Sequence, residues 1–287
     1  MVMINFSVKK IGLVVAVGLL IAGVFLSRGK ISALFSFGPD WSPVRPGDVS
    51  LPPSSQILAP DVERPEIKES GESSKSKPPA YTGRDPQEAR PNPEEVKLFS
   101  EAQKAKIYSD IRMHGSAVKE NPDYFFGWMQ TGLLKKVIGD FAGARDAWEY
   151  AGQIRSENSV SFGNLGELYW RYLPDFLRSE KNFRIAIKNK PDDPATYMSL
   201  SDLYLYSYAE KKELAGDILL EGIAANPDSI DLMKYLARYY EVQKKYDSAL
   251  EWWQKVLAKD PANFEVVTTI ESLKKKIEAK PQYITPY

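Results

Sequence analysis

Residues 246–263 read YDSALEWWQKVLAKDPAN, which combines apolar and charged residues and ends near a proline. Ala249, Trp253 and Val256 follow one another at intervals of four and three residues, so they lie on one face of an α-helix. Pro261 ends that helix, because proline lacks the amide donor that a helix interior needs. The stretch therefore predicts an amphipathic helix that must bury one face against other elements.

The same order of residues recurs upstream, and the large residues that open successive units are 34, 35 and 36 positions apart. The matching positions are Trp128, Thr131, Gly132, Ala144, Trp148 and Ala151 in the first unit, Phe162, Leu165, Gly166, Tyr169, Phe183, Ala186 and Pro191 in the second, Tyr197, Leu200, Ser201, Tyr204, Ala215, Leu219, Gly222 and Pro227 in the third, and Met233, Leu236, Ala237, Tyr240, Ala249, Trp253, Val256 and Pro261 in the fourth. A fixed period of this length predicts stacked repeats of one structural unit.

This order of large and small residues resembles the tetratricopeptide repeat over about residues 125–263. Two positions depart from the family pattern, because Lys135 replaces the usual tyrosine and Ser179 occupies a small-residue position. The resemblance implies an all-α fold, an α-solenoid of about four helix pairs, and binding of other proteins. Apolar stripes at 93–120 and 264–280 predict flanking helices, so the solenoid domain is predicted to span residues 93–280, with a C-terminal tail at 281–287.

A proline-rich stretch precedes this domain, because twelve of the twenty prolines lie between Gly38 and Glu95. Such a composition cannot bury enough apolar surface to offset the entropy lost on ordering. Residues 31–92 are therefore predicted to be a flexible, disordered Pro/Ser-rich linker. The alternative is a ligand for an aromatic groove, although no sharp proline motif is present.

The N-terminal region contains an uncharged run, IGLVVAVGLLIAGVFLS, at residues 11–27, with lysine or arginine on both sides. As a helix it covers about 25 Å, and flanking basic side chains extend the effective span toward the ~30 Å hydrocarbon core. Residues 1–30 are therefore predicted to be a short tail and an uncleaved transmembrane signal anchor. A cleaved secretion signal and a buried soluble helix are the alternatives.

The short basic tail before this run favours a cytoplasmic N-terminus, which places the repeat domain outside the cytoplasm. The protein is thus predicted to be a single-pass membrane protein that contacts the membrane through residues 11–27. Small residues four apart, Gly12 with Ala16 and Gly18 with Ala22, can let two such helices approach closely. The spacing leaves two interpretations open. It permits homodimerisation through the transmembrane helix, or it reflects only that small residues are common in such helices.

Composition excludes several classes of chemistry. Lysine plus arginine equals aspartate plus glutamate at 38 each, which gives no basic field for nucleic acid. The chain has no cysteine and one histidine, His114, and it contains no phosphate-binding glycine loop or hydrolase motif. His114 shares a stripe with Ile107 and Ile111, so a partly buried structural histidine is favoured over a proton-transfer role. We expect no cofactor, no metal and no enzyme activity; an unrecognised carboxylate site is the alternative.

The adjacent tryptophans have two interpretations. A stacking platform for nucleic acid needs exposed aromatics among basic residues, and EWWQK supplies little charge. Trp253 occupies the position of the large core residue in each second helix, whereas Trp252 lies beside that stripe. We therefore predict that Trp253 is core and that Trp252 is half-buried between successive units.

In such arrays the first helices of successive pairs line a concave groove. The residues opposite the buried stripe should face it, and they are Gln130, Leu133, Lys136, Asn164, Glu167, Trp170, Ser199, Asp202, Leu205, Tyr235, Arg238 and Glu241. This mixed set fits a protein or peptide segment that carries both charge and apolar anchors. The predicted function is a membrane-anchored interaction scaffold. The alternative is an accessory subunit of a cell-envelope enzyme or assembly complex, with catalysis supplied by a partner.

Overall fold

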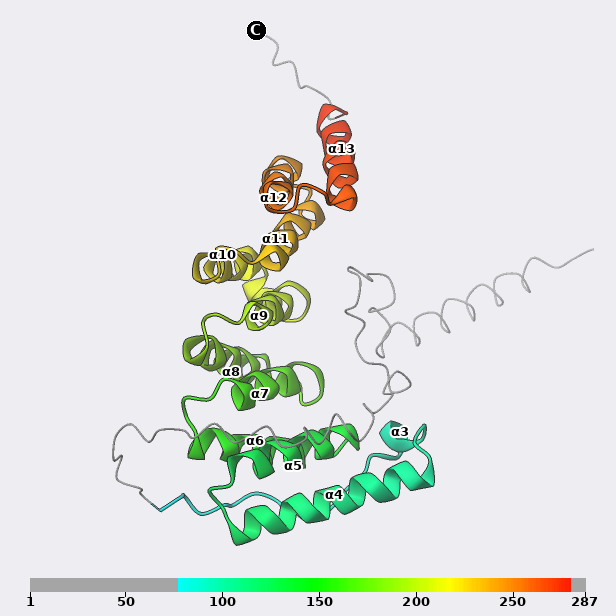
Figure 1. Cartoon of the computed structure of the whole chain (residues 1–287), viewed down its shortest axis with the longest axis vertical. Coiled ribbons are helices and arrows are strands. Elements are labelled where there is room, and N and C mark those ends of the chain that lie inside the picture. The colour runs from blue at the N-terminus through cyan, green and yellow to red at the C-terminus, as the bar shows by residue number, and fades with distance from the viewer. Residues whose placement is uncertain (1–76, 280–287) are drawn as a thin grey trace, which may run out of the picture. The chain divides into compact units, whose positions relative to one another are not determined.

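The computed structural model describes residues 77–279 (Figure 1), all of which belong to one compact unit, Glu69–Tyr287. The predicted signal anchor at 11–27, the linker up to residue 76 and the C-terminal tail at 281–287 lie outside the described residues. Among the residues that are described, no helix has both the length and the apolarity required to cross a bilayer.

The described part of the chain is helical and contains no strand. Its elements are α3 Pro93–Val96, α4 Glu101–Glu120, α5 Phe125–Val137, α6 Phe141–Ile154, α7 Val160–Arg171, α8 Phe176–Asn189, α9 Pro194–Tyr206, the 3₁₀ helix η1 Ala209–Leu214, α10 Ala215–Ala225, α11 Ile230–Val242, α12 Tyr246–Lys259 and α13 Phe264–Glu278. The all-α prediction is confirmed for these residues.

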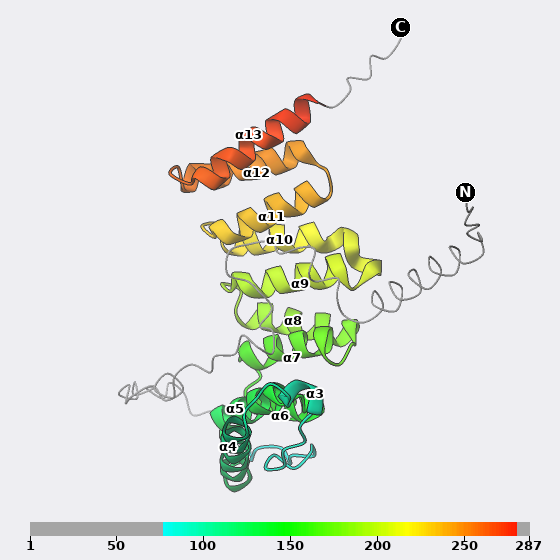
Figure 2. The ribbon, with the colours of Figure 1, turned by 90° about the vertical axis from the view of Figure 1, so that its right-hand side faces the viewer.

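Helices α5 to α12 form four pairs, α5 with α6, α7 with α8, α9 with α10 and α11 with α12. Each pair also packs on the next, because α6 contacts α7, α8 contacts α9 and α10 contacts α11. The first helices α7 and α9 lie on one side of the stack and the second helices α8 and α10 on the other (Figure 1), and the pairs follow one another as successive rungs (Figure 2). This is the predicted solenoid of four helix pairs.

Within a pair, a small residue on one helix accepts a large side chain from the other. A Cβ atom added at Gly166 on α7 would stand 2.6 Å from the ring of Phe183 on α8, which is too close for packed atoms. Phe183 is 3% exposed, and its equivalents Trp148 and Leu219 are 1% and 0% exposed. The alternation of small and large residues in the sequence therefore determines how the two helices of each pair pack together.

The two departures from the family pattern are both satisfied by hydrogen bonds. Ser179 on α8 is buried and donates its hydroxyl to the Gly166 carbonyl at 2.7 Å, which joins the two helices where they cross. Lys135 on α5 is 2% exposed, and its Nζ lies 3.1 Å from Asp140 Oδ2. Nζ also donates to the Glu88 carbonyl at 2.5 Å, so this buried charge is paired.

The tryptophan pair lies as predicted. Trp253 is 4% exposed and packs in a cluster with Ala249, Val256 and residues of α13. Trp252 is half-buried and packs against two core clusters, one formed by α8 to α11 and one formed by α11 to α13. Lys255 lies over its ring, with Nζ 3.9 Å from the centroid. The core interpretation of Trp253 is therefore confirmed.

The flanking helices differ from prediction at the N-terminal side. The apolar stripe at 93–120 predicts one helix, but the structure has α3 and then α4, which starts after Ser100. The Ser100 hydroxyl accepts from the Gln103 amide, and the Gln103 side chain accepts from the Ser100 amide, so a capping box begins a new helix there. At the other end, α13 covers the last pair with Val266, Ile270 and Leu273.

Residues 79–92 form an extended segment that packs on the first helix pair, and we call it the N-terminal strap. Tyr81 stacks on Trp128 and Tyr150 with ring centroids 4.5 and 5.3 Å away, and the Tyr150 hydroxyl donates to the Pro79 carbonyl at 2.7 Å. The Asn92 amide donates to the Ile138 carbonyl at 2.7 Å. These contacts lie on the N-terminal side of the predicted boundary at residue 93, which stays a prediction. They come from the aromatic ring and backbone of a proline-rich stretch, and composition does not reveal them.

Candidate functional site

The candidate site is the face formed by the first helices α5, α7, α9 and α11, which we call the first-helix face. All twelve residues that the sequence assigns to a groove lie on these helices, on the side away from the buried stripe. Leu133 is 46% exposed, and the other eleven are half-buried. The predicted residues therefore share one face, but most of them are partly covered by their neighbours.

Several of these side chains connect one repeat to the next. Lys136 Nζ on α5 lies 3.2 Å from Glu167 Oε2 on α7. Trp170 Nε1 on α7 donates to the Ser207 hydroxyl after α9 at 2.8 Å. Polar groups on the first-helix face thus tie consecutive repeats together as well as facing outward.

The same arrangement continues toward the C-terminal end. Arg238 Nη2 on α11 lies 3.8 Å from Glu265 Oε1 on α13, and its guanidinium is 5.9 Å from the Trp253 ring centroid. Glu241 Oε1 accepts the Trp253 Nε1 proton at 2.8 Å. Arg238 and Glu241 therefore also support the core tryptophan of the fourth pair.

Asp202 is the most unusual group on this face. It lies on α9, and desolvation by burial raises the pKa of its carboxyl from 3.8 to about 6, against the lowering effects of a Tyr235 hydrogen bond and the charge of Arg171. Its Oδ1 atom is buried and has no hydrogen-bond partner within the described chain. A buried acceptor without a donor lowers the stability of a fold by about 1–3 kcal/mol, so the position of this carboxyl destabilises the array.

Two residues beside Asp202 were missed by the sequence reasoning. Tyr206 follows it by one helical turn and is 60% exposed, and Arg171 on α7 stacks its guanidinium 3.9 Å from the Trp170 ring centroid. Both occupy the position that follows the predicted Trp170 and Leu205 in their helices. A predicted binding face that was one residue wider on each helix would have included both residues.

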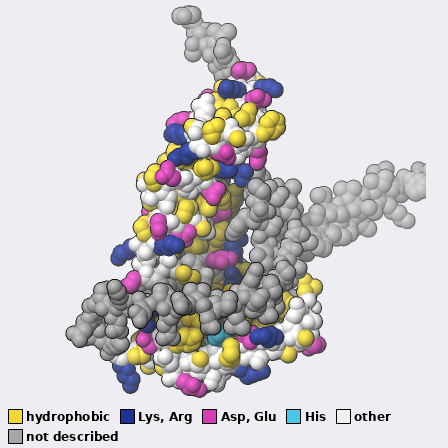
Figure 3. Space-filling view, in the orientation of Figure 1, with side chains coloured by type: hydrophobic (Ala, Val, Ile, Leu, Met, Phe, Trp, Pro, Cys, Tyr) yellow, Lys and Arg dark blue, Asp and Glu magenta, His cyan; other side chains and the backbone are white. Residues whose placement is uncertain are grey.

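Exposed large apolar side chains lie on these first helices, as well as on α4, α8, α10 and α13. Phe126, Leu133, Val160, Tyr206 and Val242 are 52, 46, 59, 60 and 47% exposed, and all five belong to first helices. The surface in view mixes apolar, basic and acidic side chains without a large area of one charge sign (Figure 3). Apolar anchors among mixed charges are the composition of protein interfaces more than of nucleic-acid sites.

Within residues 77–279 no three His, Cys, Asp or Glu side chains are grouped so that they can hold a metal ion. His114 on α4 is half-buried, and desolvation lowers the pKa of its imidazole below the ordinary 6.5. Its ring lies 6.5 Å from that of Phe126. Asp110 and Lys106 on the same helix also act on the pKa of His114, Asp110 raising it and Lys106 lowering it, each less than desolvation does.

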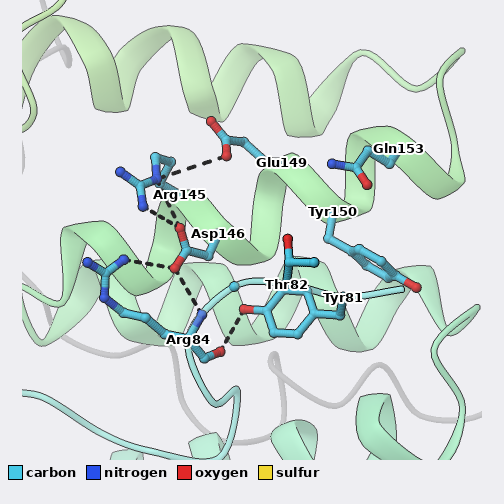
Figure 4. A pocket seen from close by; sticks show the side chains of 9 residues that line it. Tyr81, Thr82, Arg84, Arg145, Asp146, Glu149, Tyr150 and Gln153 are labelled. Atoms are coloured by element: carbon cyan, nitrogen blue, oxygen red, sulfur yellow. Dashed lines mark hydrogen bonds and ion pairs between the residues drawn. The ribbon is translucent and has the colours of Figure 1, made fainter. Parts of the chain in front are cut away.

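A second candidate is a pocket of about 420 Å³ between the N-terminal strap and α6 (Figure 4). Asp146, with a side chain 9% exposed, lies 2.8 Å from Arg84 Nη1 and 2.5 Å from Arg145 Nη2. The Tyr81 hydroxyl donates to the Arg84 carbonyl at 2.7 Å. The pocket's charged groups thus pair with one another and hold the strap in place.

Comparison with known proteins agrees with the repeat architecture of the fourth pair. Residues 230–263 match the family model described as "Tetratricopeptide repeat", and this range covers α11 and α12. Those residues are therefore a tetratricopeptide repeat within an all-helical array. No curated protein matches this sequence significantly.

Solved structures similar to this chain include the crystal structure of MamA, with 17% identity, a TM-score of 0.46, and coverage of 56% of this chain and 92% of that chain. YrrB, described as "a TPR protein with an unusual peptide-binding site", has 14% identity, a TM-score of 0.44, and coverage of 58% and 85%. A thermophilic TPR protein from Thermus thermophilus has 18% identity, a TM-score of 0.40, and coverage of 63% and 95%.

Proposed function

We propose that this chain is a tetratricopeptide-type scaffold that binds a segment of a partner protein on the first-helix face. The observation that carries the proposal is the set of exposed apolar side chains on α5, α7, α9 and α11, interspersed with polar groups. Large apolar residues exposed on one face of a repeat array mark a surface that a partner covers. Catalysis is not part of the proposed role.

Matched pairs of substitutions test this role. Leu133→Glu with Val242→Glu places two charges on the first-helix face, where the parent side chains are 46 and 47% exposed. Leu177→Glu with Leu220→Glu places the same charges on second helices, where exposure is 67 and 39%. Both double variants should keep the helicity of the parent, because exposed substitutions change stability by about 0.5 kcal/mol or less.

The readout is the set of proteins crosslinked to the full-length chain in intact cells, identified by mass spectrometry. We expect the first-helix variant to lose a partner that the parent and the second-helix variant both retain. Equal recovery of every partner by both variants would contradict binding on this face.

We further propose that residues 11–27 anchor the chain in a membrane and that the repeat domain lies outside the cytoplasm. The support is the uncharged run with basic flanks and the short N-terminal tail. Protease added to spheroplasts should then degrade the repeat domain while the chain remains in the membrane fraction. Protection of the repeat domain until the membrane is dissolved would contradict this orientation.

A further inference from the structure

Three consecutive first helices bring different side chains together at the middle of the first-helix face. Helix α7 contributes Trp170 and Arg171, α9 contributes Asp202 and Tyr206, and α11 contributes Tyr235. Tyr235 lies close enough to Asp202 to lower the pKa of its carboxyl, and the Trp170 ring is held by the hydrogen bond from its Nε1 to the Ser207 hydroxyl. We call these five residues the central cluster.

The central cluster has an acceptor that the described chain leaves unused. The Oδ1 atom of Asp202 is buried without a hydrogen-bond partner among the described residues. Asp202 also lies on the side of α9 away from the buried stripe of Tyr197 and Leu200. A donor from outside the chain would therefore recover free energy that the isolated array loses.

The aromatic residues of the central cluster are suited to a long basic side chain. Rings of Trp and Tyr pack against aliphatic stems and attract cations at their faces. Arg171 already stacks on Trp170, with 3.9 Å between the guanidinium carbon and the ring centroid. Tyr206 is 60% exposed, so its ring is available to a stem that approaches from solvent.

Building on the proposed function, we propose that the central cluster takes a lysine or arginine side chain of an extended partner segment, with Asp202 as the acceptor of its charged head. Tyr206 packs on the aliphatic stem of that side chain, and its charged head reaches Oδ1, which lies below the surface. A paired, desolvated charge at the centre of an interface is a typical binding hot spot.

Titration of the acid gives the site a pH signature. The groups that face Asp202 are Arg171 from α7, Tyr206 from its own helix and Tyr235 from α11. The two tyrosines are neutral near pH 7, because a phenol ordinarily has a pKa of about 10 and both values are raised above it here. Protonation of Asp202 as pH falls through about 6 removes the charge that the basic side chain pairs with.

A display library of random dodecapeptides, selected against the full-length protein in mild detergent, tests the inference. We expect binders that share a Lys or Arg at one position and compete with one another. Replacing that residue by norleucine, or using the Asp202→Asn variant, should weaken binding at least about tenfold, which is the lower end for a close interfacial charge pair. Glu251→Gln, an exposed change on α12, is the matched control and should leave affinity unchanged.

The pH dependence supplies a second readout. Affinity of a selected basic peptide should fall between pH 7 and 5 with the parent and stay flat with Asp202→Asn. Peptides that bind the first-helix face without a basic preference, or bind Asp202→Asn as well as the parent, would overturn this inference alone. A selection whose binders are all insensitive both to Asp202→Asn and to Leu133→Glu with Val242→Glu would contradict the proposed function and this inference together.

Discussion

Replacing Asp202 by asparagine should stabilise the fold at neutral pH. The folded-state pKa of this carboxyl is raised from 3.8 to about 6, so the folded protein binds a proton over a pH range in which the unfolded chain does not. A difference of roughly two pKa units corresponds to about 3 kcal/mol. That free energy opposes folding in full above pH 6 and vanishes below about pH 4.

Because the pKa of Asp202 is raised in the folded state, this residue makes the fold less stable as pH rises. As pH rises from 4 to 6, the contribution of Asp202 to the free energy of unfolding should fall by about 3 kcal/mol. Asparagine has nearly the same shape and carries no charge to desolvate. We therefore expect Asp202→Asn to raise the free energy of unfolding at pH 7 by about 1–3 kcal/mol, with little gain at pH 4.

Urea denaturation followed by circular dichroism at pH 4.5, 5.5, 6.5 and 7.5 measures this difference. Asp231→Asn, an exposed carboxylate change on α11, is the matched control and should alter stability by about 0.5 kcal/mol or less at each pH. If Asp202→Asn lowers stability at pH 7.5, or if its gain does not depend on pH, then Asp202 is not a destabilising, desolvated carboxylate.

Three further predictions concern packing. Trp253→Ala should cost about 3–5 kcal/mol in urea denaturation, and a loss below about 1 kcal/mol would mean that the ring is not core. Gly166→Ala should lower the free energy of unfolding by about 1–3 kcal/mol, because its Cβ would clash with the Phe183 ring. Gly163→Ala has nothing within 4 Å of the added Cβ and should be neutral or stabilising. Equal effects of the two substitutions would contradict close packing of Phe183 against Gly166. A fragment that lacks residues 77–92 should be at least about 2 kcal/mol less stable than one that starts at 77, and identical melting would show that the strap is dispensable.

The repeat architecture could be predicted because each pair repeats one local rule. Small residues such as Gly166 and large ones such as Phe183 alternate at fixed spacing, and their side chains meet across one helix crossing. That information is local in sequence and recurs in each unit. Periodicity therefore predicts the helices, the pairs and the core role of Trp253.

The strap and the state of Asp202 could not be predicted in the same way. Lys135 donates a hydrogen bond to the carbonyl of Glu88, which lies 47 residues earlier in the sequence, and no periodicity indicates such a contact. Asp202 occupies a position that looks exposed on a single helix, yet its carboxyl is desolvated in the array, where Tyr235 of the next repeat and Arg171 of the previous one lie near it. Contacts between repeats, more than contacts within a repeat, therefore determine which polar residues of the first-helix face stay exposed to solvent.

Photo-crosslinking from defined positions tests most directly that a partner binds the first-helix face. Benzoylphenylalanine would replace Leu133 or Val242 on first helices, and Lys181 or Gln254 on exposed parts of second helices, in the full-length protein in intact cells. We expect the same partner adduct from both first-helix positions and none from the second-helix positions. Adducts of that partner from Lys181 and Gln254 alone would contradict binding on the first-helix face.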